Sequence, residues 1–492
     1  MTRHFHFKGD TSGKGSIPEA LADRALRAAL VRIVTKGRLT VTTAKGQNLS
    51  FGDGTGPAVS VRFIDSRAQW AFLADADMRL GELFMDGRLV VEVGSIYDFI
   101  ALLLREAQNN THPWPARFIG TLRARLKQPN LPGRSKRNVA HHYDLDGRLY
   151  ELFLDADRQY SCAYFEHPDQ SLDEAQLAKK RHLAAKLLLE PHQRVLDIGC
   201  GWGGLARHIG ARVTKGEVLG ITLSEEQLAY ARSSLDKRDG RVSFELQDYR
   251  HLKGRFDRIV SVGMFEHVGS GSYGTFFKTC ARLLNVDGVM VLHTIGCSST
   301  PGFTTPWLKK YIFLGGYIPS LSEIVPQIEK ARMMVTDVEV LRLHYASTLE
   351  IWRDRFIAKR EAARALYDER FCRMWEVYLA AAEAAFRYED LVMFQIQIAK
   401  RNTSVPMTRN YIRDDELNAD RNLQDSRRRD AQSKSDVEGP AQHNADCVLV
   451  RRSNVGNDRA VGSIPDQPVE FVVDQQTRIG RYLIGCANDE TD

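Results

Sequence analysis

A glutamate and a histidine stand side by side directly after an apolar segment of the chain. The segment SVGMFEHVGSGSYG at 261–274 begins as the end of a strand and then presents Glu266 and His267. Seating a carboxylate and an imidazole where a hydrophobic strand meets a loop is costly unless something uses them. Glu266 can therefore act on a substrate, or it can be an ordinary acidic residue at a helix start. We interpret His267 as structural.

A glycine-rich segment is the second candidate for chemistry. VLDIGCGWGG at 195–204 has the G-x-G-x-x-G spacing of dinucleotide-binding folds, and from Asp197 it also matches D-x-G-x-G-x-G, the first motif of S-adenosylmethionine (SAM) methyltransferases. Dinucleotide folds need an acidic residue about 20 residues further on, where this chain has Thr222. Asp197 also suits a cationic methionine group better than a pyrophosphate, which it would repel. The segment therefore favours SAM over a nicotinamide cofactor.

Alternating strands and helices surround these motifs. RVLDIG, EVLGIT, VSFELQ, FDRIVSVG and GVMVLHTI predict five strands, and MMVTDVEVLRLH and LVMFQIQIAK predict two more before residue 400. This pattern predicts an α/β fold with a Rossmann-like, seven-stranded sheet and helical additions. Ser224 and Gln227 form a capping pair at the helix after the second strand, which leaves a ligand contact by Gln227 open.

The N-terminal part of the chain has a different pattern. GRLTVTTAKG and AVSVRFI alternate as strands around the turn-rich FGDGTGP, and SIYDFIALLLREA predicts a helix capped by Ser95. We expect a small α+β domain whose apolar helix is buried in its own core. A lipid-facing helix is the alternative.

The pattern divides the chain into four parts. We expect an N-terminal α+β domain at 1–112, a basic linker at 113–140, a catalytic domain at 141–412 and a disordered tail at 413–492. The linker carries seven cations and no acidic residue in PARFIGTLRARLKQPNLPGRSKRN, which fits either a solvated connector or a contact for anionic headgroups. The tail is polar, mixed in charge and without periodicity, and we assign it no role.

The composition limits what the protein can bind. A net charge of +6 over 492 residues is too small to indicate nucleic acid, and the seven cysteines show no CxxC pair or metal-ligand spacing. The sequence shows neither a secretory signal nor an apolar stretch long enough to span a bilayer. We therefore expect a cytoplasmic protein with reduced thiols and no metal, which can still touch a membrane surface.

Four further segments complete a family pattern. HHYDLDGRLYELFLDADRQYSCAYF at 141–165, LQDYR at 246–250, VGMFEHVG at 262–269 and LHTIG at 292–296, read with LDIGCGWGG, resemble the cyclopropane-fatty-acyl-phospholipid synthases from about residue 20 to about residue 412. Related mycolic-acid methyltransferases lack a long N-terminal domain, which favours the phospholipid branch. The chain departs from the family at Asp146–Arg148, and at Ala382, where some relatives have a second cysteine.

The resemblance implies an enzyme that transfers the SAM methyl group to the cis double bond of a membrane phospholipid acyl chain. Proton loss from the resulting carbocation to a bound bicarbonate would close a cyclopropane ring. The residues implied around that ion are Cys162, Glu266, His293, Ile295 and Tyr345. The residues implied around SAM are Tyr160, Ser161, Asp197, Gly199, Gly201, Gly203, Thr222, Leu223, Gln227 and Gln247.

This chemistry accounts for the residue types at the two motifs. An alkene is a poor nucleophile, so the site must be dry and oriented, and the cationic intermediate needs a weak base and a nearby negative charge. Glu266 and His293 follow adjacent predicted strands at their carboxyl ends, where such sheets bind ligands, and we expect Glu266 to orient the base. Methylation without ring closure and a lipid-binding module with a degenerate site are the alternatives.

The resemblance also implies where the protein works. Its partners would be the phospholipid substrate and the anionic inner face of the membrane, which a cytoplasmic protein would contact peripherally. The sequence does not decide whether the protein forms a homodimer.

Overall fold

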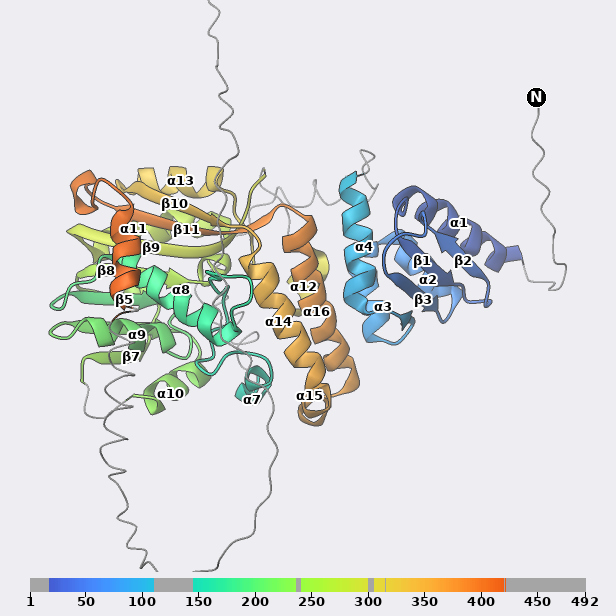
Figure 1. Ribbon diagram of the computed structural model, residues 1–492, viewed down its shortest axis with the longest axis horizontal. Helices are drawn as coiled ribbons and strands as arrows, with labels where there is room; N and C mark the ends of the chain where they lie inside the picture. Colours follow the sequence, from blue (N-terminus) through green and yellow to red (C-terminus); the bar gives the residue numbers. More distant parts are fainter. Residues whose placement is uncertain are drawn as a thin grey trace, which may run out of the picture. The chain divides into compact units, whose positions relative to one another are not determined.

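The computed structural model describes residues 17–109, 145–235, 240–299, 305–314, 316–419 and 421. A four-stranded sheet lies in the blue, N-terminal part of Figure 1, and a seven-stranded sheet lies in the green, yellow and orange part. The predicted basic linker at 113–140 and most of the predicted tail at 413–492 lie outside the described residues.

The N-terminal part is an α+β arrangement. Its sheet has the order β2-β1-β3-β4, in which β1 (Arg38–Thr42) pairs antiparallel with β2 (Asn48–Phe51) and parallel with β3 (Ala58–Phe63), and β4 (Leu89–Val93) pairs antiparallel with β3. Its helices are α1 (Ile17–Ile33), α2 (Ser66–Ala74), α3 (Ala76–Met85) and α4 (Ile96–Asn109). The predicted cap of α4 is confirmed, because the Asp98 N–H donates to Ser95 Oγ at 3.2 Å.

The seven-stranded sheet confirms the predicted fold class. Its strands have the order β10-β11-β9-β8-β5-β6-β7. Their bounds are β5 (Arg194–Ile198), β6 (Glu217–Thr222), β7 (Val242–Leu246), β8 (Phe256–Val262), β9 (Leu284–Cys297), β10 (Met334–Leu341) and β11 (Leu391–Ala399). β5 pairs parallel with both β6 and β8, whereas β11 is antiparallel to β9 and β10. The chain changes direction across the sheet at β5, and sheets of this kind bind ligands at the carboxyl ends of the strands at such a point.

Helices cover this sheet and extend it. Their bounds are α7 (Gly147–Glu151), α8 (Leu172–Leu187), α9 (Gly204–Arg212), α10 (Glu225–Ser233), α11 (Tyr273–Leu283), α12 (Pro306–Tyr311), α13 (Leu321–Lys330), α14 (His344–Ala358), α15 (Arg360–Leu366) and α16 (Glu369–Tyr388). Helices α14 and α16 lie side by side (Figure 1). Helix α4 packs against β3 of its own domain and also against α16. Its apolar side chains are therefore buried partly by its own domain and partly by α16.

The chain continues beyond β11 into a helix over residues 410–419. On this helix Ile412 is buried, and Asp415 accepts a hydrogen bond from Arg212 Nη1 of α9 at 2.5 Å. Glu416 Oε1 lies 2.6 Å from His182 Nδ1 of α8. The predicted boundary at residue 412 therefore falls within this helix, whose acidic residues have cationic partners on two other helices.

We expect a chain cut after Arg421 to keep its stability and a chain cut after Met407 to lose it. The shorter chain lacks buried Ile412 and leaves His182 without one of its carboxylate partners. Together these losses should lower the free energy of unfolding by at least about 3 kcal/mol. Denaturant unfolding of the two chains measures the difference, and equal stability would show that the 410–419 helix contributes nothing.

Candidate active site

A cavity of about 140 Å³ lies at the carboxyl ends of β5, β6 and β8. Its lining comes from the segments 158–161, 197–202, 221–223, 247–250 and 262–264, together with Leu205, Gln227, His267 and Val268. Every residue that we predicted around SAM belongs to this lining except Gly203. His267, which we interpreted as structural, belongs to it as well.

The glycine-rich segment forms the turn between β5 and α9. The N–H groups of Gly199 and Cys200 both donate to the Ile221 carbonyl of β6, at 2.9 and 3.0 Å. Gly201 has φ +55°, and a Cβ atom added there would meet no atom within 4 Å, so its backbone is open to the cavity. Gly203 also has a positive φ of +83°, but a Cβ atom there would collide with the Phe244 ring. Gly201 thus leaves room for a ligand, whereas Gly203 leaves room for packing.

The wall of the cavity offers an unpartnered carboxylate. Asp197 is buried on β5, and its Oδ2 atom has no hydrogen-bond partner among the described residues. Burial raises the pKa of this carboxyl group to about 7. The Gln227 N–H donates to Ser224 Oγ at 3.3 Å, which confirms that Ser224 caps α10. The other half of the predicted capping box is not formed, because the Gln227 side chain accepts from Thr222 Oγ1 at 3.0 Å and the Ser224 N–H donates to Thr222 Oγ1 at 3.2 Å. An open glycine turn beside an unpartnered acid fits a ligand with a cationic methionine group.

Helix α8 holds the segment that carries Tyr160 and Ser161. Lys179 Nζ donates to Ser161 Oγ at 2.8 Å and to Gln159 Oε1 at 3.0 Å, and Gln176 Nε2 donates to the Ser161 carbonyl at 2.9 Å. Lys179 and Gln176 are fully buried, and burial lowers the pKa of Lys179 to about 8. Sequence reasoning missed both residues, because a lysine within LAKKRH has the pattern of a solvated helix face.

The predicted catalytic residues Glu266 and Ile295 are in direct contact. Glu266 lies in the short 3-10 helix η2 (Phe265–His267) after β8, and its Oε1 atom accepts a hydrogen bond from the Ile295 N–H of β9 at 2.6 Å. Its Oε2 atom is buried without a partner in the described part of the chain. Burial raises the pKa of the Glu266 carboxyl group to about 7. Ile295 therefore orients this carboxyl group through its backbone.

His293 and Cys162 are buried groups that favour their neutral forms. Gln395 of β11 lies opposite His293 of β9, and its Nε2 atom is 3.2 Å from His293 Nδ1. His293 Nε2 has no hydrogen-bond partner within the described ranges. Burial holds the pKa of His293 well below its usual value and raises the pKa of the Cys162 thiol.

Lys179 links the two sets of predicted residues. Burial has the largest effect on the pKa values of Asp197, Cys162 and His293, and the positive charge of Lys179 has the second largest. That charge lowers all three pKa values. One buried cation thus lies within electrostatic reach of members of both sets. Tyr345 of α14 is also buried, with its ring centroid 5.9 Å from that of Trp352.

Both departures from the family pattern have a place in the fold. Asp146 caps α7, because its carboxylate accepts a hydrogen bond from the Arg148 N–H at 2.9 Å. Ala382 lies half-buried on α16. Across the described ranges, no group of three or more His, Cys, Asp or Glu side chains is arranged to hold a metal ion. None of the described helices has the length and apolar character that crossing a membrane requires.

The turn after β5 and the acid beside it place this sheet among the SAM-dependent methyltransferases, to which its structural neighbours also belong. Comparison of the sequence narrows that class further. The model of the mycolic acid cyclopropane synthetase family matches residues 132–396, and the chain belongs to this family.

Named relatives fall into the same family. The chain is 39% identical over 331 residues to the cyclopropane-fatty-acyl-phospholipid synthase of Escherichia coli K12, a match that covers 67% of this chain and 84% of that relative. It is 40% identical over 272 residues to a probable fatty acid methyltransferase of Pseudomonas putida, covering 53% and 68%.

Two solved structures share the fold of the catalytic part. The cyclopropane synthase MmaA2 of Mycobacterium tuberculosis is 33% identical with a TM-score of 0.51, covering 54% of this chain and 98% of that one. The mycolic acid cyclopropane synthase CmaA1, complexed with SAH and CTAB, is 34% identical with a TM-score of 0.51, covering 54% and 97%.

We expect Gly201→Val to weaken SAM binding at least about tenfold, because a side chain there enters the space that a ligand needs against the backbone. Gly254→Val is the matched control. Gly254 has φ +96° and open space around a Cβ atom, so it shares the backbone strain of about 1–2 kcal/mol and lies outside the cavity lining. Isothermal titration calorimetry measures both affinities. Undiminished SAM affinity in a folded Gly201→Val protein would refute this site.

Proposed function

We propose that the protein transfers the methyl group of SAM to the cis double bond of an unsaturated phospholipid acyl chain and closes a cyclopropane ring, with the proton lost to a bound bicarbonate. The observation that carries this proposal is a pair of buried, unpartnered polar atoms, Glu266 Oε2 and His293 Nε2. His293 lies within electrostatic reach of Lys179, the same buried cation that acts on Asp197 in the SAM cavity. The name of the Escherichia coli relative, of which this chain covers 84%, supports the same reaction.

SAM supplies an electrophilic methyl group to this site. The protein must then keep the alkene away from water, tolerate a carbocation on the acyl chain and remove one proton. In the overall balance, one C–S bond, the π bond of the alkene and one C–H bond of the transferred methyl group break, two C–C bonds form, and one proton is released. Cys162, His293 and Tyr345 are all buried, so the residues themselves exclude water from these steps.

The same residues fit an anion such as bicarbonate. A carboxyl group with a pKa of about 7 is populated in its ionised form as well as in its neutral form near neutral pH, and ionised Glu266 can accept a hydrogen bond from the O–H of bicarbonate. His293 and Cys162 are neutral, so no fixed negative charge on them repels an anion. Lys179 adds a nearby positive charge. Because the Ile295 N–H already donates to Glu266, we assign Ile295 to holding that carboxyl group.

We also propose that the protein meets its substrate at the inner face of the membrane, as a peripheral protein. The substrate requires this contact, because a phospholipid acyl chain lies within a bilayer. The basic linker at 113–140 supports contact with anionic headgroups, each nearby cation being worth about 1 kcal/mol.

We expect Glu266→Gln to lower turnover at least about 100-fold while SAM affinity is retained, because the amide keeps the shape but replaces an acceptor oxygen with a donor. Glu174→Gln is the control, because Glu174 forms a capping box with Ser171 at the start of α8. It should cost about 1 kcal/mol of stability or less and leave turnover intact. Turnover of unsaturated phospholipid vesicles and calorimetry with SAM measure both. Near-normal turnover in Glu266→Gln would contradict the catalytic role.

The same variant tests the buried carboxyl group through the pH dependence of stability. Because burial raises the pKa of Glu266 from 4.5 to about 7, folding favours its protonated form. Its contribution to stability is fully present below pH 4.5 and is lost as the pH rises through 7, a change of about 3 kcal/mol. An amide does not titrate. The stability of Glu266→Gln relative to the natural protein should therefore rise by about that amount between pH 4.5 and about pH 8.

A further inference from the structure

Helix α8 turns a row of polar side chains toward the interior of the protein. Gln176, Lys179, His182 and Lys186 are spaced three or four residues apart, so they share one helix face. Their exposed fractions are 0%, 0%, 3% and 0%. Gln176 and Lys179 hold the segment 159–161 of the SAM site, as described above. The other end of the row, at Lys186, lies against Glu339 of β10 and Gln395 of β11. Gln395 in turn contacts His293 of β9.

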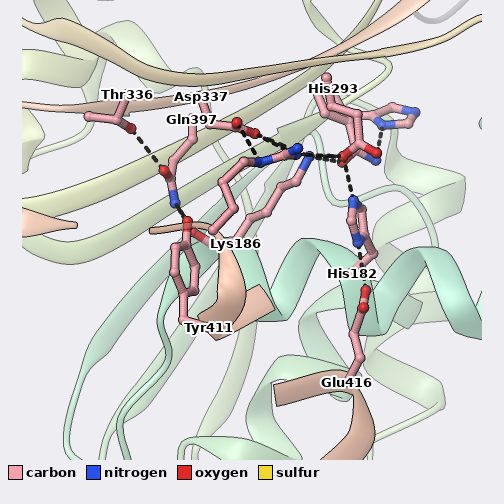
Figure 2. Close-up of polar contacts among 11 residues, drawn as sticks. His182, Lys186, His293, Thr336, Asp337, Gln397, Tyr411 and Glu416 are labelled. Atoms are coloured by element: carbon pink, nitrogen blue, oxygen red, sulfur yellow. Dashed lines mark hydrogen bonds and ion pairs between the residues drawn. The ribbon is translucent and has the colours of Figure 1, made fainter. Parts of the chain in front are cut away.

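Lys186 and His182 share one carboxylate (Figure 2). Glu339 of β10 accepts hydrogen bonds from Lys186 Nζ and from His182 Nε2, the latter at 2.7 Å, and Glu416 lies 2.6 Å from His182 Nδ1. Burial opposes a charge on His182, but the hydrogen bonds with Glu339 and Glu416 outweigh it and raise its pKa. Asp337 lies 3.7 Å from Lys186 Nζ. The two carboxylates beside Lys186 keep a positive charge on its ammonium group, although burial lowers its pKa.

The ammonium group of Lys186 decides which way the Gln395 amide points. Lys186 Nζ donates to Gln395 Oε1 at 2.9 Å. An ammonium group has donors and no acceptor, so the Gln395 oxygen must face it and the NH₂ group must face the other way. That NH₂ group lies 3.2 Å from His293 Nδ1.

The orientation of Gln395 in turn determines the proton on His293. Because the Gln395 NH₂ group donates, His293 Nδ1 must accept, and the single proton of the neutral ring must then sit on Nε2. We propose that Lys186 and Gln395 are positioning residues that fix His293 as the Nε2–H tautomer. This inference deepens the proposed function and rests on the role of His293 in it.

The tautomer matters for a site that contains a methyl donor. The unpartnered nitrogen of His293 is Nε2, and with a proton it has no free lone pair that SAM could methylate. The same N–H can donate a hydrogen bond to an anion. The opposite tautomer would present a lone pair to both ligands, which would compete for the methyl group and repel the anion.

Gln395→Glu tests the proposal with a side chain of nearly the same shape. A carboxylate there still accepts from Lys186, but it can only accept from His293, so the proton should move from Nε2 to Nδ1. Two-dimensional NMR of the full chain labelled with ¹⁵N-histidine, with His293 assigned by its loss in His293→Asn, reads which nitrogen is protonated. We expect Nε2–H in the natural protein and Nδ1–H in Gln395→Glu. Turnover of the variant should fall at least about tenfold, with SAM affinity unchanged.

Gln397→Met is the matched control. Gln397 lies two residues from Gln395 on β11 and is equally buried, but its amide donates to the Lys186 carbonyl at 2.6 Å and to Tyr411 Oη at 2.8 Å (Figure 2). Its loss should lower stability without moving the proton on His293. Turnover should stay within about twofold.

Two results would overturn the inference: Nδ1–H in the natural protein, or unchanged Nε2–H in Gln395→Glu. Reversal of the tautomer with full turnover would overturn the positioning role. A natural protein that has the Nε2–H tautomer but modifies no lipid supports the tautomer assignment and contradicts the proposed function instead.

Discussion

Lys179 and Lys186 of helix α8 have no exposed surface, so their ammonium groups require partners inside the protein. Those partners connect α8 with the other elements of the catalytic part. Lys179 takes its partners from the segment that lines the SAM cavity, and Lys186 takes its partners from β10 and β11. An unpaired buried ammonium group would cost several kcal/mol. The segment, the helix and the sheet are therefore held in one arrangement.

Burial pushes four ionisable groups of the predicted site toward their neutral forms. Burial raises the pKa values of Asp197 and Glu266 to about 7, raises that of Cys162 and lowers that of His293. Fixed charges would attract water, whereas methyl transfer to an alkene requires a dry site. A neutral lining can still hold charged ligands, because a cation lowers the pKa of Asp197, and bicarbonate can donate its O–H to the Glu266 carboxyl group and accept a hydrogen bond from His293.

The sheet and the cavity could be predicted from the sequence because their signals are local. Apolar strands separated by helical segments predict the order of elements. The D-x-G-x-G-x-G spacing from Asp197 predicts a turn that binds SAM. The partners of the buried lysines could not be predicted in this way. Gln395 lies 209 residues from Lys186, and neither residue belongs to a motif. The 410–419 helix was missed for the same reason, since DDELNAD reads as a solvated segment until Arg212 and His182 are placed beside it.

Ring closure distinguishes the proposed reaction from simple methylation of the acyl chain. The most direct measurement uses the full chain, vesicles of a cis-unsaturated phospholipid and SAM whose methyl group carries three deuterium atoms, with mass spectrometry of the released acyl chains. Ring closure predicts a cyclopropane product that retains two deuterium atoms, because the hydrogen removed at the site comes from the transferred methyl group. A methyl-branched product that keeps all three deuterium atoms, or an acyl chain without deuterium, would contradict it.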